Sequence, residues 1–556
     1  MATIVLYSIL LILLTPPLGA YMYRVYTRPG RGRIEAVVYR LLGVNPDAEQ
    51  SWRRYASSVL WFSGISMLFI YLLFRLQQFL PLNPQSLPPV NPYVSFNTAA
   101  SFMTNTNWQV YAGERTMSYL SQMLALTFQN FLSAAVGMAV LVAMIRGFTR
   151  TGTENLGNFW RDTVRGVLYV LMPLAAIVAV VLMSQGVVQT LGHYVSVKGI
   201  QGFTQLIARG PAASQIAIKQ LGTNGGGFFN ANSSHPFENP TPISNFVEMF
   251  AILWIPAALT YTFGKMVGNR RQGWVLFAAM WILMVAGFAT TVPGERHATP
   301  AMQAAGISAS APNVEGKEVR IGPDESSLWA VATTDASNGS VNSMHDSYQA
   351  LGQVAPIFNI AVGEVIWGGV GSGLYGMIFY VVVAVFIGGL MVGRTPEYLG
   401  KKIKARQVKL VVIAILVPFL VVLAFTAIAV VIPAGLKGRL NSGPHGFSEI
   451  LYAYLSQGNN NGSAFAGITA SGPWYAISGG IAMLVARFVP LLAALALGAS
   501  VGRDKTVPFT AGTLRTDTGL FVGLLIGVIV IIGALTFLPA FALGPIVEHL
   551  MHGGLA

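Results

Sequence analysis

Ten apolar stretches, each long enough to cross a lipid bilayer as a helix, constrain this chain more than any other feature of its sequence. A transmembrane helix needs about 20 mostly apolar residues. Only 10% of the 556 residues are charged, whereas a soluble chain carries about 25%. The sequence therefore predicts an all-α, polytopic membrane protein with transmembrane helices near residues 3–23, 56–80, 118–145, 164–184, 243–264, 274–293, 374–392, 410–433, 475–500 and 518–541.

The first apolar run, Thr3–Leu14, is expected to be a span and not a cleavable signal peptide, because no basic segment precedes it. We expect this helix to be kinked at Pro16 and Pro17. The chain contains no cysteine, which excludes disulfides and thiolate metal sites.

The net charge of +13 has a topological explanation. The loops on one side of the predicted membrane hold 23 of the 34 Lys and Arg residues but only 8 of the 21 acids. By the positive-inside rule this side is cytoplasmic, so both termini are predicted to face outward. The positive charge is therefore not a nucleic-acid footprint, and its densest loop, residues 393–409, is expected to dock a partner or bind anionic lipid.

Each of the four long loops on the opposite side carries a similar phrase before a long apolar span. Aligned on Asn105, Asn224, Asn338 and Asn461, the phrases lie 119, 114 and 123 residues apart. Such a near-constant period predicts four copies of one helix–pore-loop–helix unit around a central pore. The candidate ion-selecting residues are Thr104, Asn105, Thr106, Asn107, Thr223, Asn224, Gly225, Gly226, Gly227, Ser337, Asn338, Gly339, Ser340, Asn460, Asn461, Gly462 and Ser463.

The four predicted units cover residues 56–150, 151–272, 273–409 and 410–502. A first span with a cytoplasmic loop, residues 1–55, precedes them, and a final span, residues 503–556, follows them. The second unit holds the most informative stretch, Leu221–Pro242, with three consecutive glycines. A phosphate cradle is excluded there, because no Gly-Lys-Ser/Thr follows and the flanking segments have membrane length. A flexible surface turn and a re-entrant loop lining a cation path both remain open.

A segment too short to span precedes each phrase and is suited to a half-inserted helix. These segments are Pro92–Phe102, Pro211–Leu221, Ser326–Thr334 and Phe447–Ser456. A half-helix that ends at membrane depth points the negative end of its dipole toward the centre, which favours a cation there. Backbone carbonyls without a ring of carboxylates suit a weakly hydrated monovalent ion, potassium first and sodium second.

Two further features bear on an ion path. Six glycines fall within Gly363–Gly376, so we predict that the second helix of the third unit is broken at membrane depth. Gly368, Gly369, Gly371 and Gly373 would then form a gating loop, the alternative being close helix packing through small residues. Arg487 interrupts the apolar run Ile481–Ala499. Two interpretations remain for it: a positive charge below the ion site, or a structural ion pair with Glu364 or Glu248.

Several long motifs resemble the family of potassium-binding subunits of the bacterial Kdp pump. The resemblance runs nearly end to end and is carried by Gly222–Thr241, Thr104–Gln109, Gly368–Gly373 with Gly393–Lys402, Gly443–Ser448 and Asn459–Gly467. It implies the four-unit superfamily of potassium transporters, with an outward-facing selectivity filter that includes Thr106, Asn107, Gly225, Gly226, Asn338, Gly339, Asn461 and Gly462. In the first phrase Thr106 stands where the others have glycine, which implies an asymmetric pore.

The resemblance also implies a multi-subunit assembly in a bacterial cytoplasmic membrane. The partners would be a P-type ATPase subunit (KdpB), a single-span subunit (KdpC) and a very small subunit (KdpF). Potassium would enter here and pass through an intramembrane tunnel to the ATPase subunit. The chain would bind K⁺ as its substrate and no covalent cofactor, with ATP and Mg²⁺ acting only through the partner.

Three alternatives stay open at this stage. A stand-alone channel or cation symporter could use the same four units without an ATPase partner. A membrane scaffold would use its loops only to dock partners. An intramembrane enzyme is disfavoured, because the sequence suggests no catalytic pair or metal-ligand cluster, and His235 and His345 are expected to be isolated and outward-facing.

Overall fold

A computed structural model describes residues 2–363, 365–391, 393, 395–508 and 513–551. Within these residues, ten helices are long and apolar enough to cross a membrane, which confirms the predicted number and positions of the spans. They are Thr3–Thr27, Trp52–Phe79, Ser121–Thr149, Phe159–Ser184, Pro242–Met266, Arg270–Ala304, Ser372–Met391, Ala405–Ala429, Pro473–Gly502 and Gly519–Met551. The residue limits of the four units stay predictions.

Four successive sets of elements each place a short helix between two spans. The first holds α3 (Trp52–Leu76), α4 (Pro92–Met103), η2 (Ser121–Thr127) and α6 (Phe128–Thr149). The second holds α7 (Phe159–Arg165), η3 (Gly166–Leu171), α8 (Met172–Ser184), α9 (Ala212–Leu221) and α10 (Pro242–Met266). The third holds α11 (Arg270–Glu295), α13 (Gly322–Asp335), α14 (Ala350–Ala361) and α15 (Ser372–Met391). The fourth holds α16 (Ala405–Ala429), α18 (Gly443–Gly458) and α19 (Pro473–Gly502).

The remaining elements lie outside this pattern or in its loops. Helix α1 (Ala2–Thr27) packs along α10, and α2 (Arg33–Leu41) follows it. The chain ends with α20 (Gly519–Phe541), η6 (Ala542–Ile546) and α21 (Val547–Met551). Short helices in loops are η1 (Gln77–Phe79), α5 (Gly113–Thr116), η4 (Asn232–Ser234), α12 (Pro300–Ala304), η5 (His345–Ser347) and α17 (Pro433–Leu436). Three antiparallel pairs complete the described part: β1 (Gln50–Ser51) with β2 (Asn155–Gly157), β3 (Val195–Lys198) with β4 (Thr204–Ile207), and β5 (Glu397–Tyr398) with β6 (Lys401–Lys402).

The four predicted half-helices are present as α4, α9, α13 and α18. Their starts follow local chemistry: α4 begins with a proline in its first turn, and the Asn91 side chain accepts a hydrogen bond from the Tyr93 N–H. Helices α13 and α18 begin at Gly322 and Gly443, earlier than predicted, because each has a proline in its first turn. All four are largely buried.

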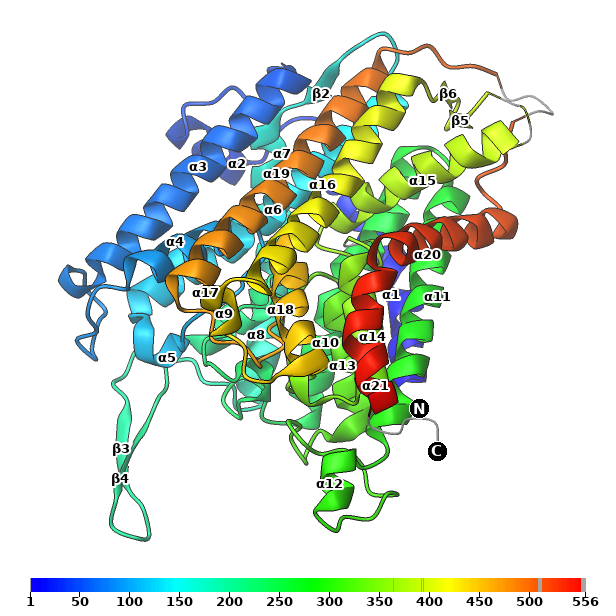
Figure 1. Ribbon diagram of the computed structural model, residues 1–556. Coiled ribbons are helices and arrows are strands. Elements are labelled where there is room, and N and C mark those ends of the chain that lie inside the picture. The colour runs from blue at the N-terminus through cyan, green and yellow to red at the C-terminus, as the bar shows by residue number, and fades with distance from the viewer. Residues whose placement is uncertain (1, 364, 392, 394, 509–512, 552–556) are drawn as a thin grey trace.

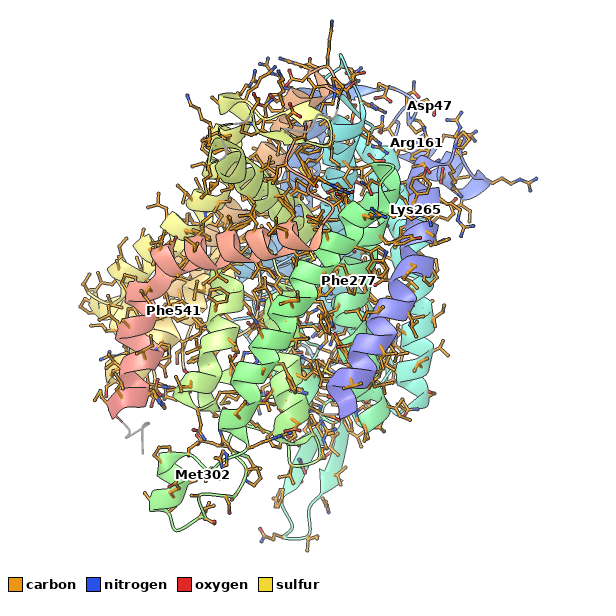
Figure 2. All side chains as sticks on the ribbon, turned by 90° about the vertical axis from the view of Figure 1, so that its right-hand side faces the viewer. Asp47, Arg161, Lys265, Phe277, Met302 and Phe541 are labelled. Carbon is orange, nitrogen blue, oxygen red and sulfur yellow. The ribbon has the colours of Figure 1, made fainter. Side chains whose placement is uncertain are left out.

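The two ends of the molecule differ in the loops they carry. Figure 1 shows the start of α1 and α21 at the same end of the bundle as the β3–β4 hairpin and α12, while β2, β5 and β6 lie at the other end. In Figure 2, Asp47, Arg161 and Lys265 lie at the end opposite Met302. The loops that were predicted to be cytoplasmic therefore gather at one end of the bundle.

Candidate ion-selecting site

Each half-helix ends in a loop with the same backbone conformation, in which two residues of positive φ flank one residue that lacks it. Positive φ is uncommon outside glycine, so four repeats of this pattern define one recurring structure. The flanking pairs are Asn105 (φ 68°) and Asn107 (55°), Thr223 (48°) and Gly225 (86°), Ser337 (47°) and Gly339 (91°), and Asn460 (54°) and Gly462 (96°).

A shared hydrogen bond fixes how the four loops correspond. The N–H of the middle residue donates to the carbonyl five residues earlier: Thr106 to Ser101 (2.9 Å), Asn224 to Lys219 (2.8 Å), Asn338 to Thr333 (3.1 Å) and Asn461 to Ser456 (2.8 Å). Equivalent positions are therefore Thr106, Asn224, Asn338 and Asn461.

The alignment on Asn105 is wrong by one residue in the first loop. Thr106, and not Asn105, takes the place of the three middle asparagines. Asn107 takes the place of Gly225, Gly339 and Gly462, because asparagine tolerates the left-handed conformation better than most side chains. The same correspondence makes Asn224 and Gly225, not Gly225 and Gly226, the counterparts of Thr106 and Asn107.

Asparagine side chains join the four loops into a closed ring. At least one hydrogen bond joins each loop to the next loop or to the half-helix that leads into it: Asn224 Nδ2 to Asn105 Oδ1 (2.5 Å), Asn338 Nδ2 to the Lys219 carbonyl (3.0 Å), Asn461 Nδ2 to the Thr333 carbonyl (3.0 Å), and Asn460 Nδ2 to Thr106 Oγ1 (2.8 Å). The structure thus brings together all four loops that the sequence singled out, in the order in which they occur along the chain.

A hollow of about 820 Å³ lies over this ring. One residue from each loop lines it, namely Asn107, Gly225, Gly339 and Gly462, which are the four equivalent positions. The carboxyl ends of the four half-helices meet at the ring, and their dipoles make it favourable for a cation. Neither the loop residues Thr104–Asn107 nor their counterparts include a carboxylate.

The other predicted residues brace the ring. Thr104 and Thr106 share a hydroxyl–hydroxyl hydrogen bond of 2.7 Å, and the Gly227 N–H donates to Gln109 Oε1 at 3.0 Å. Ser340 Oγ donates to Gln220 Oε1 at 2.9 Å, and Ser463 Oγ lies 2.7 Å from the Tyr452 hydroxyl. Gly226 packs against Phe102.

The predicted break in the third unit is confirmed, since α14 ends at Ala361 and α15 begins at Ser372. The connecting loop touches the ring: the Val370 N–H donates to Thr223 Oγ1 at 2.8 Å, and the Gly368 N–H donates to the Asp335 carbonyl at 2.7 Å. Gly371 (φ 89°) packs against the backbone of Gly137 in α6. The role of this loop as a gate stays a prediction.

Arg487 lies on α19, is 6% exposed, and lines a small cavity of about 50 Å³ together with Asn459 and Asn460 of the fourth loop. Among the described residues no carboxylate pairs with it. Glu248, one of the two proposed partners, instead accepts hydrogen bonds from Gln220 (2.9 Å) and Ser233 (2.8 Å). Glu364, the other, lies outside the described residues.

The expectation about isolated, outward histidines is wrong for His345. It is 2% exposed, and its Nδ1 lies 2.8 Å from the Tyr452 hydroxyl. A histidine that the sequence did not single out, His445, bonds Asp346 (2.9 Å) and Glu548 (2.8 Å) and so ties α21 to α18. One ligand atom each from Asp346, His445 and Glu449 also lies within 4.8 Å of the others, close enough to share a metal ion, whereas the sequence suggested no such cluster.

This histidine clasp predicts a pH-dependent stability. Desolvation lowers the pKa of His445, but the hydrogen bonds to Asp346 and Glu548 outweigh it and raise this pKa to about 10. A pKa that is higher in the folded than in the unfolded protein stabilises the folded state. This stabilisation is complete at pH values below the unfolded-state pKa of about 6.5, and it is lost as the pH rises toward 10. We expect the thermal unfolding midpoint of the wild type to decrease as the pH is raised from 7 to 10. The corresponding loss in the free energy of unfolding is up to about 4 kcal/mol.

The control for this prediction is His445→Gln, which removes the titrating group. Its midpoint should be lower than that of the wild type at pH 7 and should change less between pH 7 and pH 10. Equal slopes for the two proteins over this range would contradict the prediction.

Some contacts at the ring were not predicted from the sequence, above all those of Lys219 and Asn232. Asn232 Nδ2 donates to the Gly225 carbonyl at 2.7 Å, and Lys219 Nζ donates to Asn232 Oδ1 at 2.7 Å. The sequence does contain a sign of these contacts. Lys219 is equivalent to Ser101, Thr333 and Ser456, so one half-helix carries an ammonium at a position where the other three carry a hydroxyl.

These repeats and the closed ring of loops define a class of polytopic membrane protein with the fold of a known potassium transporter. The chain is similar in structure to the potassium transporter TrkH from Vibrio parahaemolyticus, with a TM-score of 0.54, covering 87% of this chain and 95% of that one. The two sequences are 13% identical, so this likeness is one of fold.

The chain belongs to the family of potassium-transporting ATPase A subunits (KdpA), whose model matches residues 5–550. Proteins named potassium-transporting ATPase potassium-binding subunit are similar over nearly their whole length. The relative from Sorangium cellulosum is 54% identical, covering 98% of both chains, and the one from Herpetosiphon aurantiacus is 55% identical with the same coverage. A third, from Methylobacterium nodulans, is 55% identical over 98% of this chain and 96% of its own.

Proposed function

We propose that this chain binds and translocates K⁺ as the non-hydrolytic subunit of an ATP-driven potassium import complex. The observation that carries the proposal is the ring of four loops, closed by asparagine hydrogen bonds and opening into a large hollow. Backbone carbonyls in such a ring can replace the hydration shell of a dehydrating cation. The names of the relatives point to the same ion and to the same kind of complex.

The selection of K⁺ over divalent ions follows from the chemistry of the ring. Mg²⁺ and Ca²⁺ are held in proteins mainly by charged oxygens, and the four loops supply backbone carbonyls, amides and hydroxyls instead. Converging half-helix dipoles supply partial negative charge at loops whose own residues include no carboxylate to bind a divalent ion more tightly.

Beyond the ring, we assign the cavity lined by Arg487, Asn459 and Asn460 to the route by which K⁺ leaves toward the ATPase subunit. The Arg487 charge there would oppose free inward flow of cations. The loop between α14 and α15, which bonds the underside of the ring at Thr223, would gate this exit.

In this proposal the complex lies in a bacterial cytoplasmic membrane, with both termini of this chain outside. Its partners are the ATPase, single-span and very small subunits (KdpB, KdpC, KdpF), and ATP and Mg²⁺ act through the first of these. The gathering of the basic loops at one end of the bundle supports this orientation.

Transport by reconstituted proteins tests the proposal. Liposomes that hold the assembled complex should accumulate K⁺ from micromolar external concentrations when ATP is supplied, and liposomes that hold this chain alone should not. Gly225→Asp, which adds a carboxylate to the ring, should raise the half-saturating K⁺ concentration at least about tenfold.

Two results would overturn the proposal. Sustained K⁺ flux through the chain alone would identify a stand-alone channel or symporter. Unchanged uptake at micromolar K⁺ in the Gly225→Asp complex would mean that the loops do not select the ion and would favour a scaffold role.

A further inference from the structure

The four half-helices differ at one equivalent position behind the ring. Ser101, Thr333 and Ser456 carry hydroxyls there, and Lys219 carries an ammonium. In the third and fourth loops the hydroxyl holds the ring directly: Thr333 Oγ1 accepts from the Gly339 N–H at 3.0 Å, and Ser456 Oγ accepts from the Gly462 N–H at 3.0 Å.

The second loop lacks this brace and has a different one. Lys219 Nζ donates to Asn232 Oδ1 at 2.7 Å and to Glu238 Oε2 at 2.5 Å, and the side chains of Lys219 and Glu238 are both fully buried. Asn232, which is 8% exposed, donates through Nδ2 to the Gly225 carbonyl at 2.7 Å. A buried ion pair is thus connected to a ring carbonyl through one amide.

The ammonium also determines which way the amide points. Lys219 is only a donor, so the oxygen of the Asn232 amide must face it. The amide nitrogen then faces Gly225 and can donate to its carbonyl. Glu238 holds the ammonium in place and, through Oε1, accepts a hydrogen bond from the Phe229 N–H at 2.8 Å, so it also fixes the chain just after the three glycines.

The second loop needs such a brace more than the others do. Gly225, Gly226 and Gly227 have no side chains to hold their peptide planes, and consecutive glycines reach many conformations at low cost. The carbonyl of Gly225 is therefore the ring carbonyl whose direction depends most on an outside donor.

We propose that Asn232 is a positioning residue for ion selection, which holds the Gly225 carbonyl in the direction that distinguishes K⁺ from other alkali cations, with the Lys219–Glu238 ion pair fixing its amide. The inference rests on the proposed function. It deepens that function by assigning specificity to residues that lie behind the ring.

The test is Asn232→Asp in the assembled complex, which keeps the size of the side chain and an oxygen for Lys219 but removes the N–H donor. ATP-driven uptake is measured with K⁺ and with Rb⁺. We expect the half-saturating K⁺ concentration to rise about tenfold and the preference for K⁺ over Rb⁺ to fall at least about threefold, with a maximal rate within about threefold of wild type.

Asn239→Asp is the matched control. Asn239 is buried in the same loop and donates to the Ser233 carbonyl (3.1 Å) and to Asn245 Oδ1 (2.9 Å), but it has no hydrogen bond to a ring residue. This variant should keep the K⁺ to Rb⁺ preference of the wild type. An equal loss of preference in both variants would show a merely structural effect and would overturn the inference.

A further variant and a reference variant complete the design. Asn232→Ala removes the donor without adding a carboxylate, and it is measured by the same ratio if Asn232→Asp does not assemble. Gly225→Asp is assayed alongside: if it weakens K⁺ uptake while both Asn232 variants keep the wild-type preference, this inference fails and the proposed function stands. If Gly225→Asp leaves uptake unchanged, the proposed function itself fails.

Discussion

Replacing Gly462 by alanine is expected to weaken K⁺ binding on the order of 100-fold, about 2.8 kcal/mol. Gly462 has a φ of 96°, which an L side chain rarely adopts, and an added Cβ would lie less than 3.0 Å from the Thr106 carbonyl oxygen. The fourth loop must therefore move away from the first, and their hydrogen bond from Asn460 to Thr106 must lengthen. Strain of this kind costs about 1–3 kcal/mol. This strain displaces the carbonyls that surround the ion.

The measurement is the half-saturating K⁺ concentration for ATP-driven uptake by the assembled complex. Gly306→Ala is the control, because Gly306 has a similar φ of 90° but nothing within 4 Å of an added Cβ. That variant carries the same backbone strain without the clash and should keep the wild-type affinity. Comparable K⁺ affinities in Gly462→Ala and Gly306→Ala would contradict a filter at this position.

The sequence predicted much of the fold, because the bilayer imposes strong rules on it. Each span must be long and apolar, and the ten helices follow that rule. The half-helices were recognisable because they are helical in pattern yet too short to span. The break before Ser372 was recognisable because six glycines in fourteen residues do not form a continuous helix.

The register of the first loop could not be read from residue letters. Asn105 matches the other asparagines in identity, but Asn107 matches the glycines in backbone conformation. Asparagine can serve either as an amide that bridges two loops or as a residue of positive φ. The pattern of positive φ angles and the hydrogen bond from Thr106 to Ser101 distinguish the two alignments.

Contacts between distant side chains lay beyond the sequence altogether. The bond from Asn232 to Gly225 depends on how the chain returns after the three glycines, and the clasp of His445 joins residues about 100 positions apart. Neither has a spacing that a local pattern could reveal. A lysine at the position of three hydroxyl residues becomes meaningful only after the register is known.

Replacing Gly371 by alanine is expected to increase passive K⁺ leak through the complex on the order of tenfold. Gly371 has a φ of 89°, and an added Cβ would lie less than 3.0 Å from the backbone of Gly137 in α6. The loop between α14 and α15 must then move away from α6, and its hydrogen bond from Val370 to Thr223 must weaken. If this loop closes the exit below the ring, destabilising its closed position by about 1.4 kcal/mol makes the open position about ten times more populated.

The leak is measured as K⁺ efflux from liposomes that hold the complex without ATP, and coupling as K⁺ transported per ATP hydrolysed. Gly268→Ala is the control, because Gly268 has a positive φ of 74° with nothing within 4 Å of an added Cβ. It should match the wild type in both measurements. A gate predicts that Gly371→Ala raises leak and lowers coupling together, because the same displaced loop admits ions that the ATPase has not driven. Close helix packing alone predicts a less stable complex whose surviving fraction transports K⁺ at the normal ratio, and that result would reject the gate.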